Sequence, residues 1–290
     1  MTANASAGTG EAGDGKRRRL LVPVDGSAPA EAAARYAARY AAQLGAADVL
    51  IAHVRPAGTP ADVDPALRAA EAVHAAGVAC TQTIEQGDAI QAILRLAARA
   101  DEIVIGRTGT GQAKEMVAGS VTQKILLLAS CPVTVVGADA AISAAGSRHR
   151  LLLAVDGSAR AAAAVAYACR LAAAHPAVAI ELVNVVGPIP PGFLWESMTP
   201  QRLERYYQEE GERTLAGARA ALAAAGVAFG QRICSGYVID RLRDAARTGG
   251  CSRLVMGSSG HGTASGAMLG SVAYRAIHAF PVPVTIVKPG

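Results

Sequence analysis

Short apolar runs alternate with longer alanine-rich stretches along the whole chain. Four runs in the first half are four to six residues long and show little alternation of polar and apolar positions: 20–24, 49–54, 102–105 and 133–136. Such runs are typical of strands buried on both faces, as in a parallel sheet. Residues 78–84 alternate well enough to predict a fifth strand. Helices are predicted for the stretches between the strands: 29–44, 66–76, 88–100 and 121–129.

The first predicted helix has clear boundary signals. Ser27 is a candidate N-cap, Pro29 stands early in the helix, and Gly45 follows its end. Pro23 argues mildly against a central position for the strand at 20–24, because proline has no amide hydrogen to donate to a neighbouring strand.

The same pattern then restarts. Leu151–Ser158 repeats Leu20–Ser27 at an offset of 131 residues, and Pro283 repeats Pro132 at an offset of 151. The second copy is longer by 18 residues between its second and third strands, a region that contains Trp195, the only tryptophan. Each copy alternates strand and helix, which predicts an open, doubly wound parallel sheet.

We therefore expect an α/β protein with two tandem Rossmann-like sheets of five strands each, and we assume the strand order 3-2-1-4-5 within each sheet. The predicted boundaries are a disordered leader at 1–16, a first domain at 17–138, a linker at 139–147 and a second domain at 148–290.

Two glycine-rich segments share the spacing G-x2-G-x9-G-S. The first comprises Gly106, Gly109, Gly119 and Ser120, and the second, at an offset of 151, comprises Gly257, Gly260, Gly270 and Ser271. Each follows an apolar run and precedes a predicted helix. Glycines can turn their amide groups toward one point, and with the helix N-terminus they form a cradle for anionic oxygens. The repeated spacing predicts a phosphate-binding element in each half, although the two serines could also be N-caps alone.

An acid follows the first strand of each copy, as Asp25 and Asp156. In a 3-2-1-4-5 sheet the strand order reverses between strands one and four, and ligands bind there, outside the carboxyl ends of the strands. We therefore expect the acid and the glycine loop to share one crevice. On its own, Asp25-Gly26-Ser27 could be only a turn and a helix cap; the matching glycine loop favours binding.

Composition argues against several classes of protein. No apolar run reaches the roughly 18 residues that span a bilayer, and residues 1–15 lack the apolar core of a secretory signal. The net charge is +5, with four basic residues at 16–19, but nothing else clusters basic and aromatic residues as a nucleic-acid surface would. The five cysteines show no metal-ligand spacing, so we expect free thiols in a reducing cytoplasm.

The motifs resemble those of the universal stress protein family. Val22-Pro-Val-Asp25-Gly-Ser27, His53-Val54 and the glycine pattern occur in that order, and the resemblance covers nearly the whole chain as two tandem copies. The second copy departs from the first in having Ala154 in place of Pro23 and Asn184 in place of His53. The glycine pattern is that of the ATP-binding branch of the family.

The resemblance implies ATP or AMP, with Mg²⁺, as the ligand. Asp25 and Asp156 resemble the acid that faces the adenine and ribose, and Val54 and Val185 resemble the valine whose backbone holds the adenine edge. Gly106 and Gly257 resemble the glycine that lies against the ribose. The implied phosphate cradles are Gly109, Gly119, Ser120 and Val121 in the first copy, and Gly260, Gly270, Ser271 and Val272 in the second.

The resemblance also implies that the two domains pair through their last strands, 133–136 and 284–287, as a pseudo-dimer within one chain. The sequence also leaves open the possibility that two chains form a homodimer. Arg107 and Lys114 could neutralise phosphate charge in the first site, whereas His53 and His261 are expected to be structural or inert.

Three classes of function stay open. The leading one is an ATP-binding regulatory protein of stress survival or growth arrest, with no catalytic residues and little or slow hydrolysis. The second is an ATPase or phosphotransferase, although the chain has no G-x-x-x-x-G-K-[ST] and no further acid placed by a motif. The third is a structural dimerisation module with empty crevices.

Overall fold

The computed structural model describes residues 17–45, 47–56, 58, 64–107, 120–140, 149–188, 199–258 and 269–289. Strands and helices alternate in both halves. The first half contains β1 (Arg18–Val24), α1 (Ala28–Leu44), β2 (Ala47–Arg55), α2 (Pro65–His74), β3 (Cys80–Gln86), α3 (Ala89–Ala97), β4 (Glu102–Gly106), α4 (Ser120–Leu128) and β5 (Val133–Val136). The second half contains β6 (His149–Ala154), α5 (Ala159–Ala174), β7 (Val178–Val186), α6 (Pro200–Ala224), β8 (Phe229–Ser235), α7 (Val238–Thr248), β9 (Arg253–Gly257), α8 (Ser271–Ala279) and β10 (Val284–Val287).

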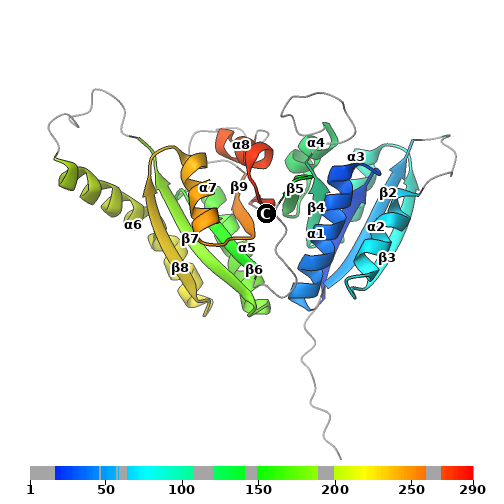
Figure 1. Ribbon diagram of the computed structural model, residues 1–290, viewed down its shortest axis with the longest axis horizontal. Helices are drawn as coiled ribbons and strands as arrows, with labels where there is room; N and C mark the ends of the chain where they lie inside the picture. Colours follow the sequence, from blue (N-terminus) through cyan, green and yellow to red (C-terminus); the bar gives the residue numbers. More distant parts are fainter. Residues whose placement is uncertain are drawn as a thin grey trace, which may run out of the picture.

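The strands form one sheet in the order β3-β2-β1-β4-β5-β10-β9-β6-β7-β8. Each half therefore has the expected 3-2-1-4-5 order, but the halves share a single ten-stranded sheet instead of forming two separate ones (Figure 1). They join because β5 and β10 pair antiparallel, with Thr134 opposite Thr285. Since the strand order is symmetric about this pair, an approximate twofold axis passes between the two threonines.

Helices cover both faces of the sheet. α1, α2, α5 and α6 pack on one face, in a core that contains Leu20 and Leu151, and α3, α4, α7 and α8 pack on the other, against Leu21 and Leu152. Neighbouring residues of β1 and of β6 thus point to opposite cores, which is the two-residue period of a strand. Because both faces are covered, the stretches 20–24 of β1 and 151–154 of β6 are apolar throughout.

The alanine content of α1 brings its backbone close to the sheet. Its buried positions are mostly alanines, with Tyr36, Tyr40 and Leu44 as the larger side chains. Ser27 is the N-cap, as predicted, and Gly45 ends the helix with a φ of 70°, a conformation that suits glycine.

The expectation from Pro23 is wrong, because β1 is a central strand that lies between β2 and β4. The ladder between β1 and β4 includes only Leu20 and Leu21, so Pro23 lies beyond it and removes no hydrogen bond from that side. The missing amide hydrogen is therefore tolerated where β1 and β4 cease to pair.

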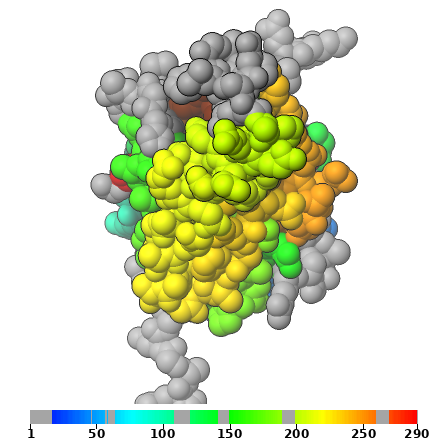
Figure 2. Space-filling model, turned by 90° about the vertical axis from the view of Figure 1, so that its left-hand side faces the viewer, coloured from blue at the N-terminus to red at the C-terminus, as the bar shows by residue number. Residues whose placement is uncertain are grey.

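The longer second copy carries the 25-residue helix α6. Its buried residues, Gly211, Leu215, Ala218 and Leu222, lie from its middle to its C-terminal end, and the helix forms much of the outer surface in Figure 2. Residues 189–198, with Trp195, lie outside the described residues, as do the leader and residues 141–148 of the linker region. Over the ranges that the structure describes, no helix is long and apolar enough to cross a membrane.

Candidate functional site

The two acids occupy equivalent turns after β1 and β6. Asp25 Oδ1 accepts a hydrogen bond from the Ser27 amide at 3.0 Å, and Asp156 Oδ1 accepts one from the Ser158 amide at the same distance. Both serines then cap the helix that follows. Each carboxylate is thus fixed by its own turn and remains exposed at the carboxyl end of a central strand. The expected turn and helix cap are therefore present in both halves, and both acids are exposed.

A polar side chain from the neighbouring strand supports each turn. His53 Nδ1 lies 2.8 Å from the carbonyl oxygen of Val24, and Asn184 Nδ2 donates to the carbonyl of Val155 at 2.7 Å. Each carbonyl belongs to the residue before the acid. The histidine and the asparagine therefore make equivalent contacts to the backbone in the two halves. This agrees with the structural role expected for His53.

Gly106 and Gly257 end the fourth strand of their halves against the start of a helix. A Cβ atom on Gly106 would lie 2.6 Å from the carbonyl carbon of Pro29, and one on Gly257 would lie 2.7 Å from that of Arg160. Real Cβ atoms do not approach backbone so closely, so only glycine fits here. These glycines bring the end of β4 or β9 against the first turn of α1 or α5, beside the acid-bearing turn.

The predicted cradle residues include the first turns of α4 and α8. Ser120 and Ser271 are exposed, and Val121 and Val272 are half-buried. Thr122 Oγ1 donates to the carbonyl of Gly106 at 2.9 Å, which ties α4 to the end of β4. In the second half, the Gly270 amide donates to the carbonyl of Ser258 at 2.8 Å, which ties the start of α8 to the end of β9.

The N-cap interpretation of Ser271 is wrong. Gly270 is the N-cap of α8, with no side-chain cap hydrogen bond, and Ser271 is the first helical residue. The first amide groups of a helix have no acceptor within the helix and carry the positive end of its dipole. The hydroxyl and amide of Ser271 therefore stand at a place suited to an anion.

Val54 and Val185 lie near the carboxyl ends of β2 and β7, half-buried against the core under α3, α4, α7 and α8. Gly109, Gly119 and Gly260 lie outside the described residues, as do Lys114 and His261. The structure thus brings the acid, the strand-end glycine and the helix start of each half to the same end of the strands, and it does not describe the middle of either glycine loop.

A cavity of about 540 Å³ lies between α7 and α8 in the second half. Ser271 and Val272 contribute to its lining, together with Gly236 after β8 and the cations Arg243 and Arg275. This volume is within the usual range for a site that holds a small molecule.

Arg107 does not have the role suggested for it. Its guanidinium donates to the carbonyl of His278 at 2.8 Å and forms an ion pair with Asp139 at 2.7 Å. Because His278 belongs to α8, this side chain ties the first half to the second instead of neutralising phosphate.

Sequence reasoning missed a buried polar cluster between the halves, centred on Glu102 and Arg253. A signal was present, because Glu102 begins a predicted strand, Arg253 directly precedes an apolar run, and the two residues stand 151 residues apart, the offset that relates the two glycine loops.

Comparisons with known proteins agree with the repeated fold. The model of the universal stress protein family matches residues 16–137 and 147–288. A universal stress protein of Mycolicibacterium smegmatis is 30% identical over 227 residues, which cover 73% of this chain and 70% of that protein. One of Mycobacterium tuberculosis is 26% identical over 214 residues, 69% of this chain and 65% of the relative.

Among solved structures, a universal stress protein from Archaeoglobus fulgidus has the same fold. The TM-score is 0.67 at 21% identity, and the match covers 94% of this chain and 98% of the other. Two successive matches to the family model account for most of the sequence. The chain therefore belongs to the universal stress protein family.

Proposed function

We propose that each half binds an adenine nucleotide, ATP or AMP, at the carboxyl ends of its central strands, and that occupancy regulates the protein in stress survival or growth arrest. The observation that carries the proposal is the repeated grouping of an exposed acid, a strand-end glycine and the N-terminus of a helix. Asp156, Gly257 and Ser271 form this group in the second half, and Asp25, Gly106 and Ser120 form it in the first.

The chemistry of the group suits a nucleotide. The helix start offers amide hydrogens and a hydroxyl to phosphate oxygens, and the acid can accept from ribose hydroxyls. Mg²⁺ would accompany the nucleotide, held by its phosphate oxygens. Val54 and Val185, from the adjacent strand in each half, would hold the adenine edge. The cavity beside Ser271 and Val272 adds room for a small ligand in the second half.

We further propose that the protein is a binding protein of the cytoplasm and turns over ATP slowly or not at all. The carboxylates of Asp25 and Asp156 each accept a hydrogen bond from a turn amide, which suits a positioning group. The five cysteines are free, in keeping with a reducing compartment.

The test places a negative charge at the helix start without weakening the helix. Ser271→Asp and Ser120→Asp put a carboxylate in the first turn, where it should stabilise α8 or α4 by about 0.3–1 kcal/mol but repel phosphate. Calorimetric titration with ATP, AMP and GTP should give two sites per chain in the unmodified protein, one in each single variant and none in the double variant.

Ser271→Ala is the matched control, because it removes the hydroxyl without adding charge and should weaken binding only modestly. If the double Asp variant still binds two nucleotides per chain, the helix starts are not the phosphate sites. If the unmodified protein binds none and carries none after purification, the proposal fails in favour of a structural pairing module.

A further inference from the structure

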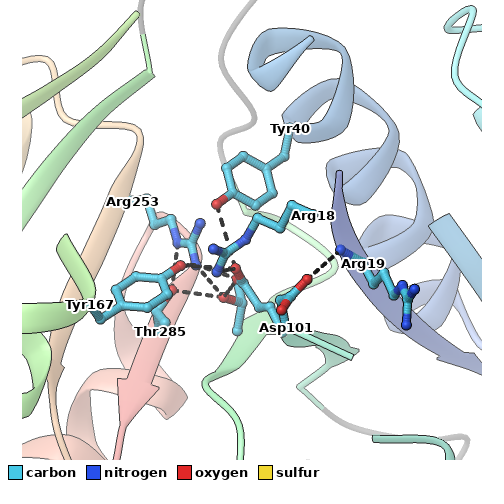
Figure 3. Close-up of polar contacts among 9 residues, drawn as sticks. Arg18, Arg19, Tyr40, Asp101, Tyr167, Arg253 and Thr285 are labelled. Atoms are coloured by element: carbon cyan, nitrogen blue, oxygen red, sulfur yellow. Dashed lines mark hydrogen bonds and ion pairs between the residues drawn. The ribbon is translucent and has the colours of Figure 1, made fainter. Parts of the chain in front are cut away.

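The junction between the halves buries an ion pair close to the approximate twofold axis. Glu102 at the start of β4 and Arg253 at the start of β9 form it, and neither side chain has any exposed surface. Figure 3 shows Arg253 with Tyr167 and Thr285 beside it. The two residues occupy equivalent positions, 151 residues apart. One position of the repeat therefore carries an acid in the first half and a base in the second.

Two threonines on the axis connect the charges through a chain of hydrogen bonds. Arg253 Nε donates to Thr285 Oγ1 at 2.5 Å, and Thr134 donates to Glu102 Oε1 at 2.5 Å. The two threonine oxygens are 2.7 Å apart. Since each hydroxyl has one hydrogen and that of Thr134 goes to Glu102, Thr285 donates to Thr134. All the hydrogens then point from the arginine toward the glutamate, a direction that two identical halves could not provide.

Aromatic residues enclose the pair. Tyr167 donates to Glu102 Oε2 at 2.9 Å and accepts from Arg253 Nη2 at 2.8 Å. The guanidinium carbon of Arg253 lies 4.7 Å from the ring centre of Tyr40, and Arg18 donates to Glu102 Oε2 at 3.0 Å. Burial alone would raise the pKa of Glu102, but the charges of Arg253 and Arg18 outweigh it and hold the pKa below its usual value, so the carboxyl stays ionised.

Pairing of two second halves would bury two Arg253 side chains against each other. In the second half, His149 takes the place of Arg18, at an offset of 131 residues. Burial and the charge of Arg253 lower the pKa of His149 to about 3, so it is neutral. In the described part of this cluster the only acid is Glu102, which belongs to the first half. Two second halves would therefore leave two buried cations uncompensated, which is strongly unfavourable.

Pairing of two first halves would place two Glu102 side chains at the axis. Each half would bring its own Arg18, so the charges would balance in number. Arg253 and its hydrogen bonds to the glutamate and the threonines would be absent, and the two carboxylates would lie close together across the axis. Both Thr134 hydroxyls would donate to their own glutamates, so no hydrogen would remain for the contact between the threonine oxygens, which are 2.7 Å apart in the native pair. This pairing is disfavoured by repulsion between the two neighbouring carboxylates and between the two threonine oxygens.

We propose that Glu102 and Arg253 determine which domains pair at the last-strand edge: a first half joins a second half and rejects a copy of itself. An apolar pair at these positions could stabilise the junction equally well, but it would accept every combination of halves. Buried opposite charges at symmetry-equivalent positions add a penalty against the wrong combinations.

The proposal is tested in the full chain by charge exchange. Glu102→Arg and Arg253→Glu each create a like-charge junction. The exchange variant combines both with Arg18→His and His149→Arg, so that each charged group and the histidine move to their equivalent positions in the other half. Arg17→Glu is the matched control, because it makes the same chemical change at the exposed ion pair with Asp48. Unfolding by urea is followed for each chain, with size measured by light scattering.

We expect the two single variants to lose most of their resistance to urea, or to fail to fold, while Arg17→Glu changes little. The exchange variant should fold as the native-sized species and recover more than half of the loss. An exchange variant that is no more stable than either single variant, or that also fails to fold, overturns the proposal, because complementary charge would then be insufficient for pairing.

The pH dependence of stability shows whether the single variants are destabilised by like charge or by altered packing. In Arg253→Glu, two carboxylates face each other among Arg18, Tyr36, Tyr40, Tyr167 and His149, and uptake of one proton would relieve their repulsion. Relative to the unmodified protein, this variant should regain stability as the pH falls from 8 to 5. Glu102→Arg should not, because guanidinium groups do not titrate there. Equal pH profiles for the two variants would contradict the proposal.

Discussion

Replacement of Gly257 by alanine tests the close approach of β9 to α5, on which the second site depends. The added Cβ would lie 2.7 Å from both the carbonyl carbon and the oxygen of Arg160, and 2.9 Å from the amide nitrogen of Ala161. All three atoms are backbone at the start of a helix, so no side-chain rotation can remove the overlap. The first turn of α5 must move away from the strand.

Overpacking of this kind costs about 1–3 kcal/mol. For a cooperative unit of a few hundred residues, each kcal/mol lowers Tm by about 2–4 °C, so the melting temperature should fall by about 2–12 °C. Gly106→Ala should behave in the same way, since its Cβ would lie 2.6 Å from the carbonyl carbon of Pro29.

The matched control is Gly217→Ala on α6, where an added Cβ meets no atom within 4 Å. Alanine is the better helix former by about 0.5–1 kcal/mol, so this variant should be slightly more stable than the unmodified protein. Thermal unfolding followed by circular dichroism measures all three variants. If Gly257→Ala has the same melting temperature as the unmodified protein, β9 does not lie against α5 as the structure has it. If nucleotide binding is also measured, Gly257→Ala should weaken one of two sites.

Three further changes address individual contacts. His53→Asn should keep the bond to the Val24 carbonyl, as Asn184 does for Val155, whereas His53→Leu should cost about 1–3 kcal/mol in urea unfolding; equal losses would show that the bond is unimportant. Ser158→Ala removes the bond from the Ala161 amide, 3.1 Å long, and should lower the free energy of unfolding by about 1 kcal/mol; no change would mean that the cap contributes nothing. Burial first, and then Arg253, lower the pKa of His149 from 6.5 to about 3. The unfolded chain therefore takes up a proton before the folded chain does. The stability from neutral His149 is complete above pH 6.5 and falls by about 1.4 kcal/mol per pH unit below it, a slope that His149→Asn should remove from urea unfolding curves between pH 5 and 7.

The strand positions and the repeat were predictable because they depend on local patterns, whereas the strand order was assumed from the doubly wound fold and is confirmed by the structure. Buried runs such as 20–24 and 103–105 cannot be amphipathic, and the constant offset of 151 between the glycine segments fixes the correspondence of the halves. The strand expected at 78–84 lies at Cys80–Gln86 instead. β3 pairs with β2 only from Cys80 onward, and Val78 lies before the strand, buried in the core that includes Val73.

The cross-half contacts were not predictable because they join residues far apart in the sequence. Arg107 could be assigned to phosphate only while its true acceptor, the carbonyl of His278, was unknown. Ser271 looked like an N-cap because serine favours that position, yet the chain enters α8 through Gly270. Glu102 and Arg253 were missed as a pair because each, taken alone, resembles a polar residue at the entrance to a strand.

Mutual pairing of β5 and β10 leaves β3 and β8 as the two outer margins of the sheet. Both edge strands carry charged residues: Glu85 on β3 forms an ion pair with Arg95, and Arg232 on β8 forms one with Glu181. Charged margins discourage the addition of a foreign strand, which protects against amyloid-like stacking. If chains of this protein assemble further, we expect them to associate through their helical surfaces. We do not expect a second chain to add strands to the sheet.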